Sequence, residues 1–134
     1  MRRFTSTLHI AAITGLTGVA FGAFGAHWLP ALLKELTSTE REYRLVVLAT
    51  GAQYQMYHAL ALLVLGTLQR HDERPGRWQG PAVSLTFGIL LFSGSLYGIA
   101  FSGIRQLGMI TPFGGLAFLV GWSWIAIAAR THST

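Results

Sequence analysis

The chain has 134 residues, of which 51% are hydrophobic and only 11% are charged, and its formal net charge is +5. A soluble domain carries charges on about a quarter of its residues, so this composition excludes an ordinary water-soluble fold and predicts surface in contact with lipid. The length allows one domain, residues 1–134. The basic residues are scattered along the chain, which argues against a nucleic-acid partner.

The first apolar segment, Leu8 to Leu29, is long enough to cross a bilayer, because about 20 helical residues span the hydrocarbon core. Arg2 and Arg3 precede it, as in a signal peptide, but a signal core has only roughly 7–15 apolar residues. We therefore expect this segment to be retained as the first helix. The residues from Pro30 to Ser38 are expected to form a short amphipathic piece on the membrane surface.

Glycines recur in the first segment at spacings of three, four and three, which places them on one helical face. Such a face lets another backbone approach closely in a membrane. It predicts plain close packing inside the bundle or, as the alternative, self-association of two copies. The glycines are Gly15, Gly18, Gly22 and Gly25.

The second apolar segment, Leu45 to Leu68, follows Thr39 and Glu42, which have the spacing of a capping box. Its helix is therefore expected to start outside the membrane. No formal charge occurs in this segment, but it contains Tyr54, Gln55, Tyr57 and His58.

The third segment begins at Pro81 and ends near Gly103, a residue that tolerates the left-handed conformation closing a helix. The fourth opens with Thr111 as N-cap and Pro112 as first helical residue, and runs to Ala129. The sequence thus predicts an all-α integral membrane four-helix bundle with short loops.

Orientation follows from the basic residues in short loops. The two termini and the Gln69 to Gly80 loop together hold six Lys and Arg, and the opposite loops hold four: Arg2, Arg3, Arg70, Arg74, Arg77 and Arg130 against Lys34, Arg41, Arg44 and Arg105. This count predicts that both termini are cytoplasmic. A bacterial inner membrane is the simplest location.

Polar side chains near the bilayer centre are the candidate site, because such groups are costly in lipid and face a partner or a cavity. His58 lies close to the midplane of its segment, and we predict that its partners come from Gln55 and from Ser93, Ser95 or Tyr97. We expect a polar patch that opens toward the outer face, built from His27, Tyr54, Gln55, His58, Ser93, Ser95, Tyr97 and Thr111. Two interpretations stay open: inter-helix hydrogen bonds that specify the bundle, and a solvated pocket for a ligand or ion.

Other chemistry is sparse. The chain has no Cys, which excludes disulfides and thiolate sites, and no Asp or Glu lies within the apolar segments. Ser95 has glycine beside it but lies in mid-helix, unlike a nucleophile elbow. We predict no catalytic residues, no metal site and no cofactor; haem ligation by His27 and His58, at different depths, is a third alternative.

Short motifs in all four segments resemble, in order, the signatures of one small membrane-protein family, the domain of unknown function numbered 423. The motifs are GAFGAHWL (22–29), YQMYHALALL (54–63), FSGSLY (92–97), LGMITPFGG (107–115) and GW (121–122). The family is found across bacteria and has a mitochondrial relative in animals. The resemblance implies a four-helix inner-membrane protein without an established reaction or known catalytic residues.

The resemblance also implies that several polar residues belong to the family pattern: His27, Tyr54, Gln55, His58, Ser93, Ser95, Tyr97, Thr111 and Pro112. Where this chain has Trp28 the family often has a smaller residue such as glycine, so access near His27 is expected to differ.

We therefore expect an accessory or structural membrane protein, not an enzyme, whose partners are membrane lipids and another membrane protein or a second copy. The alternative is binding or transport of a small polar solute, ion or lipid headgroup in an outward-opening pocket around His58.

Overall fold

The computed structural model describes residues 2–130, and their side chains from Ser6 onward. It has four long helices: α1 (Arg2–His27), α3 (Ser38–His71), α4 (Gln79–Ser102) and α5 (Thr111–Arg130). Three short pieces connect them: α2 (Leu29–Leu32), η1 (Pro75–Trp78) and η2 (Arg105–Met109). The predicted all-α four-helix architecture is confirmed. The side chains of Arg2 and Arg3, used to predict orientation, lie outside the described residues.

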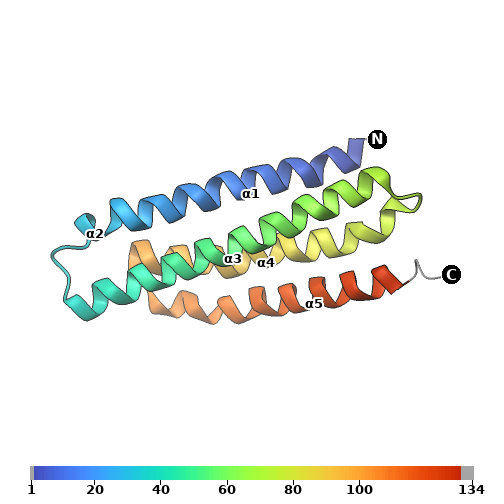
Figure 1. Ribbon diagram of the computed structural model, residues 1–134. Helices are drawn as coiled ribbons and strands as arrows, with labels where there is room; N and C mark the ends of the chain where they lie inside the picture. The colour runs from blue at the N-terminus through green and yellow to red at the C-terminus, as the bar shows by residue number, and fades with distance from the viewer. Residues whose placement is uncertain (1, 131–134) are drawn as a thin grey trace.

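The long helices run alternately up and down, and each packs on its neighbour along the chain: α1 on α3, α3 on α4, and α4 on α5 (Figure 1). The helices α1 and α5 lie on opposite sides of the α3–α4 pair. Both described ends of the chain lie at one end of the bundle, beside the α3–α4 connection. The α1–α3 and α4–α5 connections lie at the other end.

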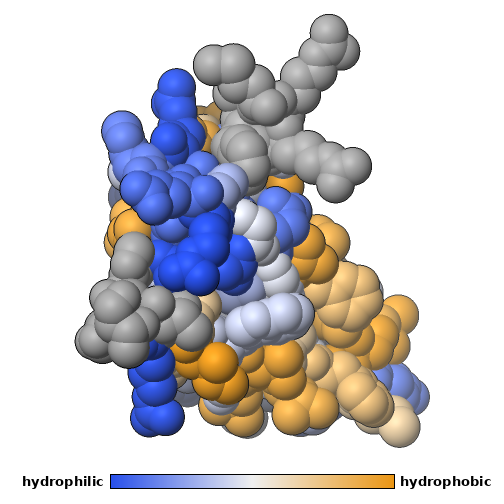
Figure 2. Space-filling model, turned by 90° about the vertical axis from the view of Figure 1, so that its right-hand side faces the viewer, coloured by the Kyte–Doolittle hydropathy of each residue, from blue (hydrophilic) through white to orange (hydrophobic). Residues whose placement is uncertain are grey.

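The outer surface is apolar over most of its length, with large side chains exposed on every long helix, among them Leu16, Leu60, Leu90 and Leu119. Figure 2 looks at the end that carries the termini, where hydrophilic residues gather and hydrophobic ones flank them. This distribution is that of a protein embedded in lipid, with its polar ends in the headgroup region.

Within the described part of the chain, three helical stretches are long and apolar enough to cross a membrane: Ser6–His27, Pro75–Ser102 and Arg105–Arg130. The helix α3 is not among them, because Gln53, Gln55 and His58 interrupt its apolar run. Its 34 residues make it about 51 Å long at 1.5 Å per residue. It therefore extends beyond the hydrocarbon core, as expected of a helix that starts outside the membrane.

The start of α3 differs from the predicted one. Thr37 is the N-cap, and its hydroxyl accepts a hydrogen bond from the Glu40 amide at 3.3 Å, so the capping residue lies two positions before the predicted Thr39. The carboxylate of Glu40 binds Arg44 at 3.0 Å and Arg105 at 2.7 Å. Because Glu40 bridges two basic residues, the pair Thr37 and Glu40 serves both the cap and the tie between α3 and η2.

The other predicted boundaries are close to those observed. Gly103 closes α4 with a φ of 74°, the left-handed conformation expected there, whereas α4 begins two residues before Pro81. The helix α5 begins at Thr111. The predicted surface piece, Pro30 to Ser38, overlaps the short helix α2, which is anchored by the buried side chains of Leu29 and Leu33.

Close packing of helices depends on glycine at several interfaces, of which α1–α3 and α4–α5 are examples. On α1, Gly18 faces Met56, Gly22 lies near Ala52 and Gly25 faces Leu48, all on α3, while Gly15 has no neighbour within 4 Å. Three of the four glycines of the predicted face therefore pack inside the bundle. On α5, Gly114 lies directly against the backbone of Phe92.

Candidate functional site

Gln55 is the centre of a hydrogen-bond network that joins three helices. Its Nε2 donates to the Thr14 carbonyl at 2.8 Å and to Thr17 Oγ1 at 2.7 Å, both on α1. Its Oε1 accepts from the Tyr97 hydroxyl of α4 at 2.7 Å. The Gln55 side chain is 4% exposed, so its amide is used entirely within the protein. Gln55 and Tyr97, both expected as partners of His58, therefore bind each other.

Two serines of α4, Ser93 and Ser95, form hydrogen bonds with the helices on either side, α3 and α5. Ser93 Oγ donates to the Gly51 carbonyl of α3 at 2.7 Å. Ser95 Oγ lies 2.6 Å from Thr111 Oγ1 of α5 and donates to its own helix at the Phe92 carbonyl. These hydroxyls therefore connect α4 to the helices on each side of it.

His58 does not have the partners that we predicted. Its Nδ1 lies 2.6 Å from the Tyr54 carbonyl, and Trp122 Nε1 donates to its Nε2 at 3.2 Å. Its ring stacks on Phe118, with the centroids 3.5 Å apart and the planes at 3°. Since the indole can only donate, Nε2 must accept and Nδ1 must carry the proton. This arrangement requires the neutral ring.

Helix geometry explains the error. Residue 58 follows residue 55 by three positions, which is 300° of rotation at 100° per residue, so the two side chains diverge by about 60°. That angle turns Gln55 toward α1 and α4 and turns His58 toward α5. The expected single patch is in fact two separate groups, a Gln55 network and a His58 cluster, with Ser95 and Thr111 as a third contact.

His27 belongs to none of these groups. It is exposed at the end of α1, where its ring lies 6.2 Å from that of Trp28. Gly25 of α1 faces Leu48, which precedes His58 by ten residues, or about 15 Å of helix. The predicted grouping of His27 with His58 is wrong, and the geometry does not support haem ligation by this pair. Among the described residues, no three His, Asp or Glu side chains form a group that could hold a metal ion.

A cavity of about 440 Å³ lies beside His58, between α3 and α5. Its walls are mainly aromatic and apolar: Tyr54, Tyr57, His58, Phe92, Gly115, Phe118, Leu119 and Trp122. Tyr57, Leu119 and Trp122 are exposed on the outer surface of the bundle, so this cavity opens sideways, toward the lipid. An outward-opening polar pocket around His58 is not what the chain forms.

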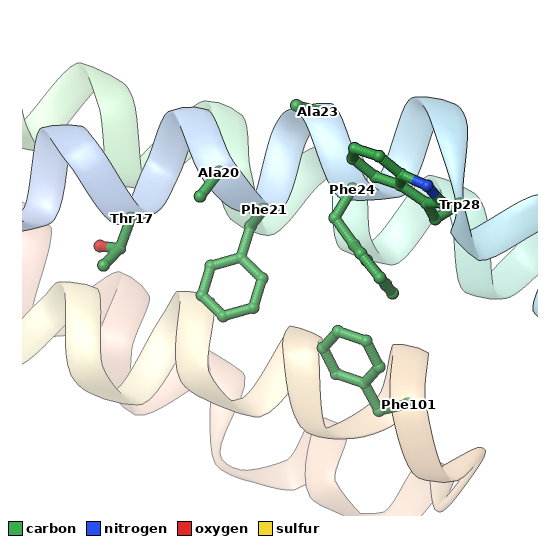
Figure 3. Close-up of a pocket in the computed structure, with 7 residues that line it drawn as sticks. All are labelled: Thr17, Ala20, Phe21, Ala23, Phe24, Trp28 and Phe101. Atoms are coloured by element: carbon green, nitrogen blue, oxygen red, sulfur yellow. The ribbon is translucent and has the colours of Figure 1, made fainter.

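A second cavity, of about 580 Å³, lies between α1 and α4 near the α2 end (Figure 3). In this view the rings of Phe21, Phe24 and Phe101 lie between the two helices, and Phe21 stacks on Tyr97 with centroids 4.1 Å apart. Sequence reasoning missed this groove. Its only signal was the spacing of Phe21, Phe24 and Trp28 on one face of α1.

Trp78 is buried at the α3–α4 connection. Its side chain is 3% exposed and its indole donates to Asp72 at 2.7 Å. The Asp72 carboxylate also accepts from the Arg74 amide at 2.8 Å and from the Arg77 guanidinium. These contacts, the Arg74 amide first, hold the pKa of Asp72 well below its usual range. Asp72 therefore fixes the α3–α4 connection.

The helices, their apolar exterior and the internal hydrogen bonds define a small multi-pass membrane protein built as an antiparallel four-helix bundle. A family model described as a protein of unknown function, DUF423, matches residues 21–115. No solved structure matches the chain.

Curated relatives agree. A UPF0382 membrane protein of Staphylococcus epidermidis, SERP0230, is 40% identical over 119 residues, covering 89% of this chain and 90% of the relative. YwdK of Bacillus subtilis is 42% identical over 120 residues, 90% and 92% of the two chains. The inner membrane protein YgdD of Escherichia coli K12 is 41% identical over 123 residues, 91% and 87% of the two chains. The chain therefore belongs to the DUF423 or UPF0382 family and is a multi-pass inner-membrane protein.

Proposed function

We propose that this protein is an accessory or structural membrane protein, which acts by binding another membrane-embedded protein and is neither an enzyme nor a carrier. The observation that carries the proposal is the internal pairing of the buried and partly buried polar side chains at membrane depth. Gln55, Ser93, Ser95, Tyr97 and Thr111 all bind groups of this chain. A path for a polar solute needs groups that can exchange these partners for solute or water.

The shape of the bundle supports the same proposal. The cavities beside His58 and Phe21 are lined mainly by apolar and aromatic side chains and lie at the surface that meets lipid. In this proposal both termini are cytoplasmic, and lipid headgroups contact the basic residues at the two ends of the bundle.

Two measurements distinguish an accessory membrane protein from a solute carrier. Cross-linking in native membranes, followed by purification in mild detergent, is expected to give one protein partner in fixed stoichiometry. Liposomes that contain only this protein are expected to show no more solute flux than empty ones. Flux that disappears in both Gln55→Leu and His58→Leu, while both variants stay folded, would overturn the proposal.

The cavity beside His58 favours a second candidate function, the binding of a small molecule. Both ring nitrogens of His58 already have hydrogen-bond partners within the chain, and aromatic side chains line most of the cavity. This lining suits a flat lipid-soluble molecule better than a polar solute or an ion. This modifies the expectation of a polar ligand.

A matched pair of proteins tests this candidate. Gly115 borders the cavity, and a Cβ added there would meet only Phe92, at 4.0 Å. Gly115→Leu should therefore fill the cavity without disturbing the backbone. A naphthoquinone with a short alkyl chain should raise the melting temperature of the unsubstituted protein but not of Gly115→Leu. An equal shift in both proteins, or none in either, would rule out this cavity as the binding site.

A further inference from the structure

The face of α3 that points away from the bundle carries polar groups at mid-membrane depth. Gln53 and Tyr57 are exposed there, in the one long helix of the described chain that does not meet the apolarity of a membrane span. Polar side chains at this depth rarely face lipid, because each unpaired group is costly in hydrocarbon. We therefore expect another protein to cover the exposed face of α3.

The exposed residues follow a regular spacing. A stripe along α3 repeats at alternating intervals of four and three residues, and consists of Val46, Thr50, Gln53, Tyr57, Leu60, Val64 and Thr67. Six of these residues are exposed, and Thr50 is partly so. Alternating spacings of four and three are those of a left-handed helix pair, in which two stripes face each other along their whole length. We call these seven residues the α3 stripe.

The hydrogen bonds along the α3 stripe leave one strong acceptor unused. The hydroxyls of Thr50 and Thr67 each donate to a carbonyl of their own helix at 2.9 Å. Gln53 Nε2 donates to the Tyr57 hydroxyl, but no hydrogen bond within the described part of the chain uses Gln53 Oε1. The Gln53 amide thus keeps an acceptor and a second donor hydrogen for a group outside this chain.

We propose that the α3 stripe is the seam of a parallel homodimer, in which the Gln53 amides of two copies bind each other near the bilayer centre. The stripe is uncharged, so it offers nothing to a partner that carries a membrane-embedded charge. A primary amide is both donor and acceptor, which makes it complementary to itself. Two copies inserted in the same orientation bring their α3 helices together in parallel, with equal residues at equal depth.

The glycine face of α1 is excluded as this seam. Gly18 and Gly25 already face Met56 and Leu48 of the same chain, so a second copy cannot reach them without opening the bundle. Self-association thus uses the outer face of α3, and it does not depend on the proposed accessory function.

The absence of cysteine from the chain makes disulfide mapping direct. Single substitutions Leu60→Cys and Val64→Cys, at exposed positions of the stripe, should give a disulfide-linked dimer when native membranes are oxidised with copper phenanthroline. Leu90→Cys is the matched control, because Leu90 is at least as exposed, 65% against 57% for Leu60, and lies on α4. It should stay monomeric.

The role of the amide is tested by energy transfer between labelled copies in liposomes at a fixed protein-to-lipid ratio. Gln53→Leu should weaken dimerisation about three-fold to twenty-fold, the range expected for losing membrane hydrogen bonds. Gln53→Asn, which keeps an amide, should retain more of the affinity. Both variants should keep the melting temperature of the monomer, since Gln53 contacts no other helix of its own chain in any hydrogen bond found.

Cross-linking at Leu90 but not at Leu60 and Val64 would overturn the proposal, because the dimer would then use another face. So would a monomer at every protein-to-lipid ratio, or cross-linking of the stripe to a different protein only. If Gln53→Leu dimerises with unchanged affinity, the two Gln53 amides do not bind each other in the dimer, and that part of the proposal is wrong.

Discussion

The side chain of Gln55 connects α1, α3 and α4. Its hydrogen bonds explain how a bundle with few charged residues fixes the relative depth of its helices. Apolar packing alone lets membrane helices slide, since lipid is as apolar as the side chains. A buried amide with three partners on two other helices has one low-energy register. Its hydrogen bonds therefore specify the arrangement as well as stabilising it.

We predict that Gln55→Leu destabilises the bundle by about 2 kcal/mol, from three lost hydrogen bonds at about 0.6 kcal/mol each. The measurement is thermal unfolding in detergent, at a dilution where the chain is monomeric. Gln53→Leu is the control, since Gln53 lies only two residues from Gln55 but on the exposed side of α3. Equal losses in both variants would show that any leucine at this depth, and not the network, sets the stability.

A second residue-scale prediction concerns Asp72. Its folded pKa is depressed, so its hydrogen bonds contribute stability above its unfolded pKa of about 3.9 and lose it as the pH falls below that value. Asp72→Asn should therefore melt at a lower temperature than the parent protein at pH 7, and the difference should shrink below about pH 4.

The neighbouring Glu73 provides the control for Asp72, because it is exposed in the same connection. Glu73→Gln should leave the melting temperature unchanged at either pH. A difference between Asp72→Asn and the parent that stays constant from pH 7 to pH 3 would contradict the assigned role of the carboxylate.

At the scale of elements, glycine decides how closely helices approach. A Cβ at Gly114 would lie 2.7 Å from the Phe92 Cα, a backbone atom that cannot move aside. Gly94, on α4, has nothing within 4 Å of the same position and is exposed. The two glycines therefore differ in purpose although both lie in membrane helices.

We expect Gly114→Ala to separate α4 from α5 and to lower stability by about 1–3 kcal/mol, the usual cost of overpacking. Gly94→Ala should be neutral or raise stability by up to about 1 kcal/mol, through helix propensity alone. The comparison is the melting temperature in one detergent. A stable Gly114→Ala together with an unstable Gly94→Ala would mean that α5 packs on α4 through another face.

The sequence predicted those features of the structure that depend on a single helix. Gly103 could be placed at a helix end because its αL conformation is a local property, and the glycines of α1 could be placed on one face by counting residues. The partners of His58 could not be predicted, because they depend on which helix lies beside α3 at that angle. Trp122, the residue that binds His58, is 64 positions away in the sequence.

For the whole molecule, the order of the helices has consequences for what the chain can do. Because α1 and α5 lie on opposite sides of the α3–α4 pair, much of the surface of every helix faces lipid or a partner. The cavities beside His58 and Phe21 both open at the sides of the bundle. An arrangement of this kind suits lateral contacts within the membrane, at the outer faces of the helices.

The last prediction concerns the orientation of the molecule in the membrane. An even number of long helices returns the chain to its starting side, which agrees with the two described ends lying together in Figure 1. At the opposite end, two of the four basic residues, Arg44 and Arg105, are bound to Glu40. Acidic residues contribute little to the orientation rule, so the count remains six against four.

Reporter fusions after residue 134 and within residues 69–80 should therefore report the cytoplasm, and a fusion within residues 34–37 the other side. A variant in which Arg70, Arg74 and Arg130 are changed to Gln reverses the count to three against four, and should shift part of the population to the opposite orientation. Since the side chains of these three arginines form no hydrogen bond within the described part of the chain, the bundle itself should stay intact. A C-terminal reporter that reads external in the unsubstituted protein would show that its orientation is set by something other than basic residues in the loops.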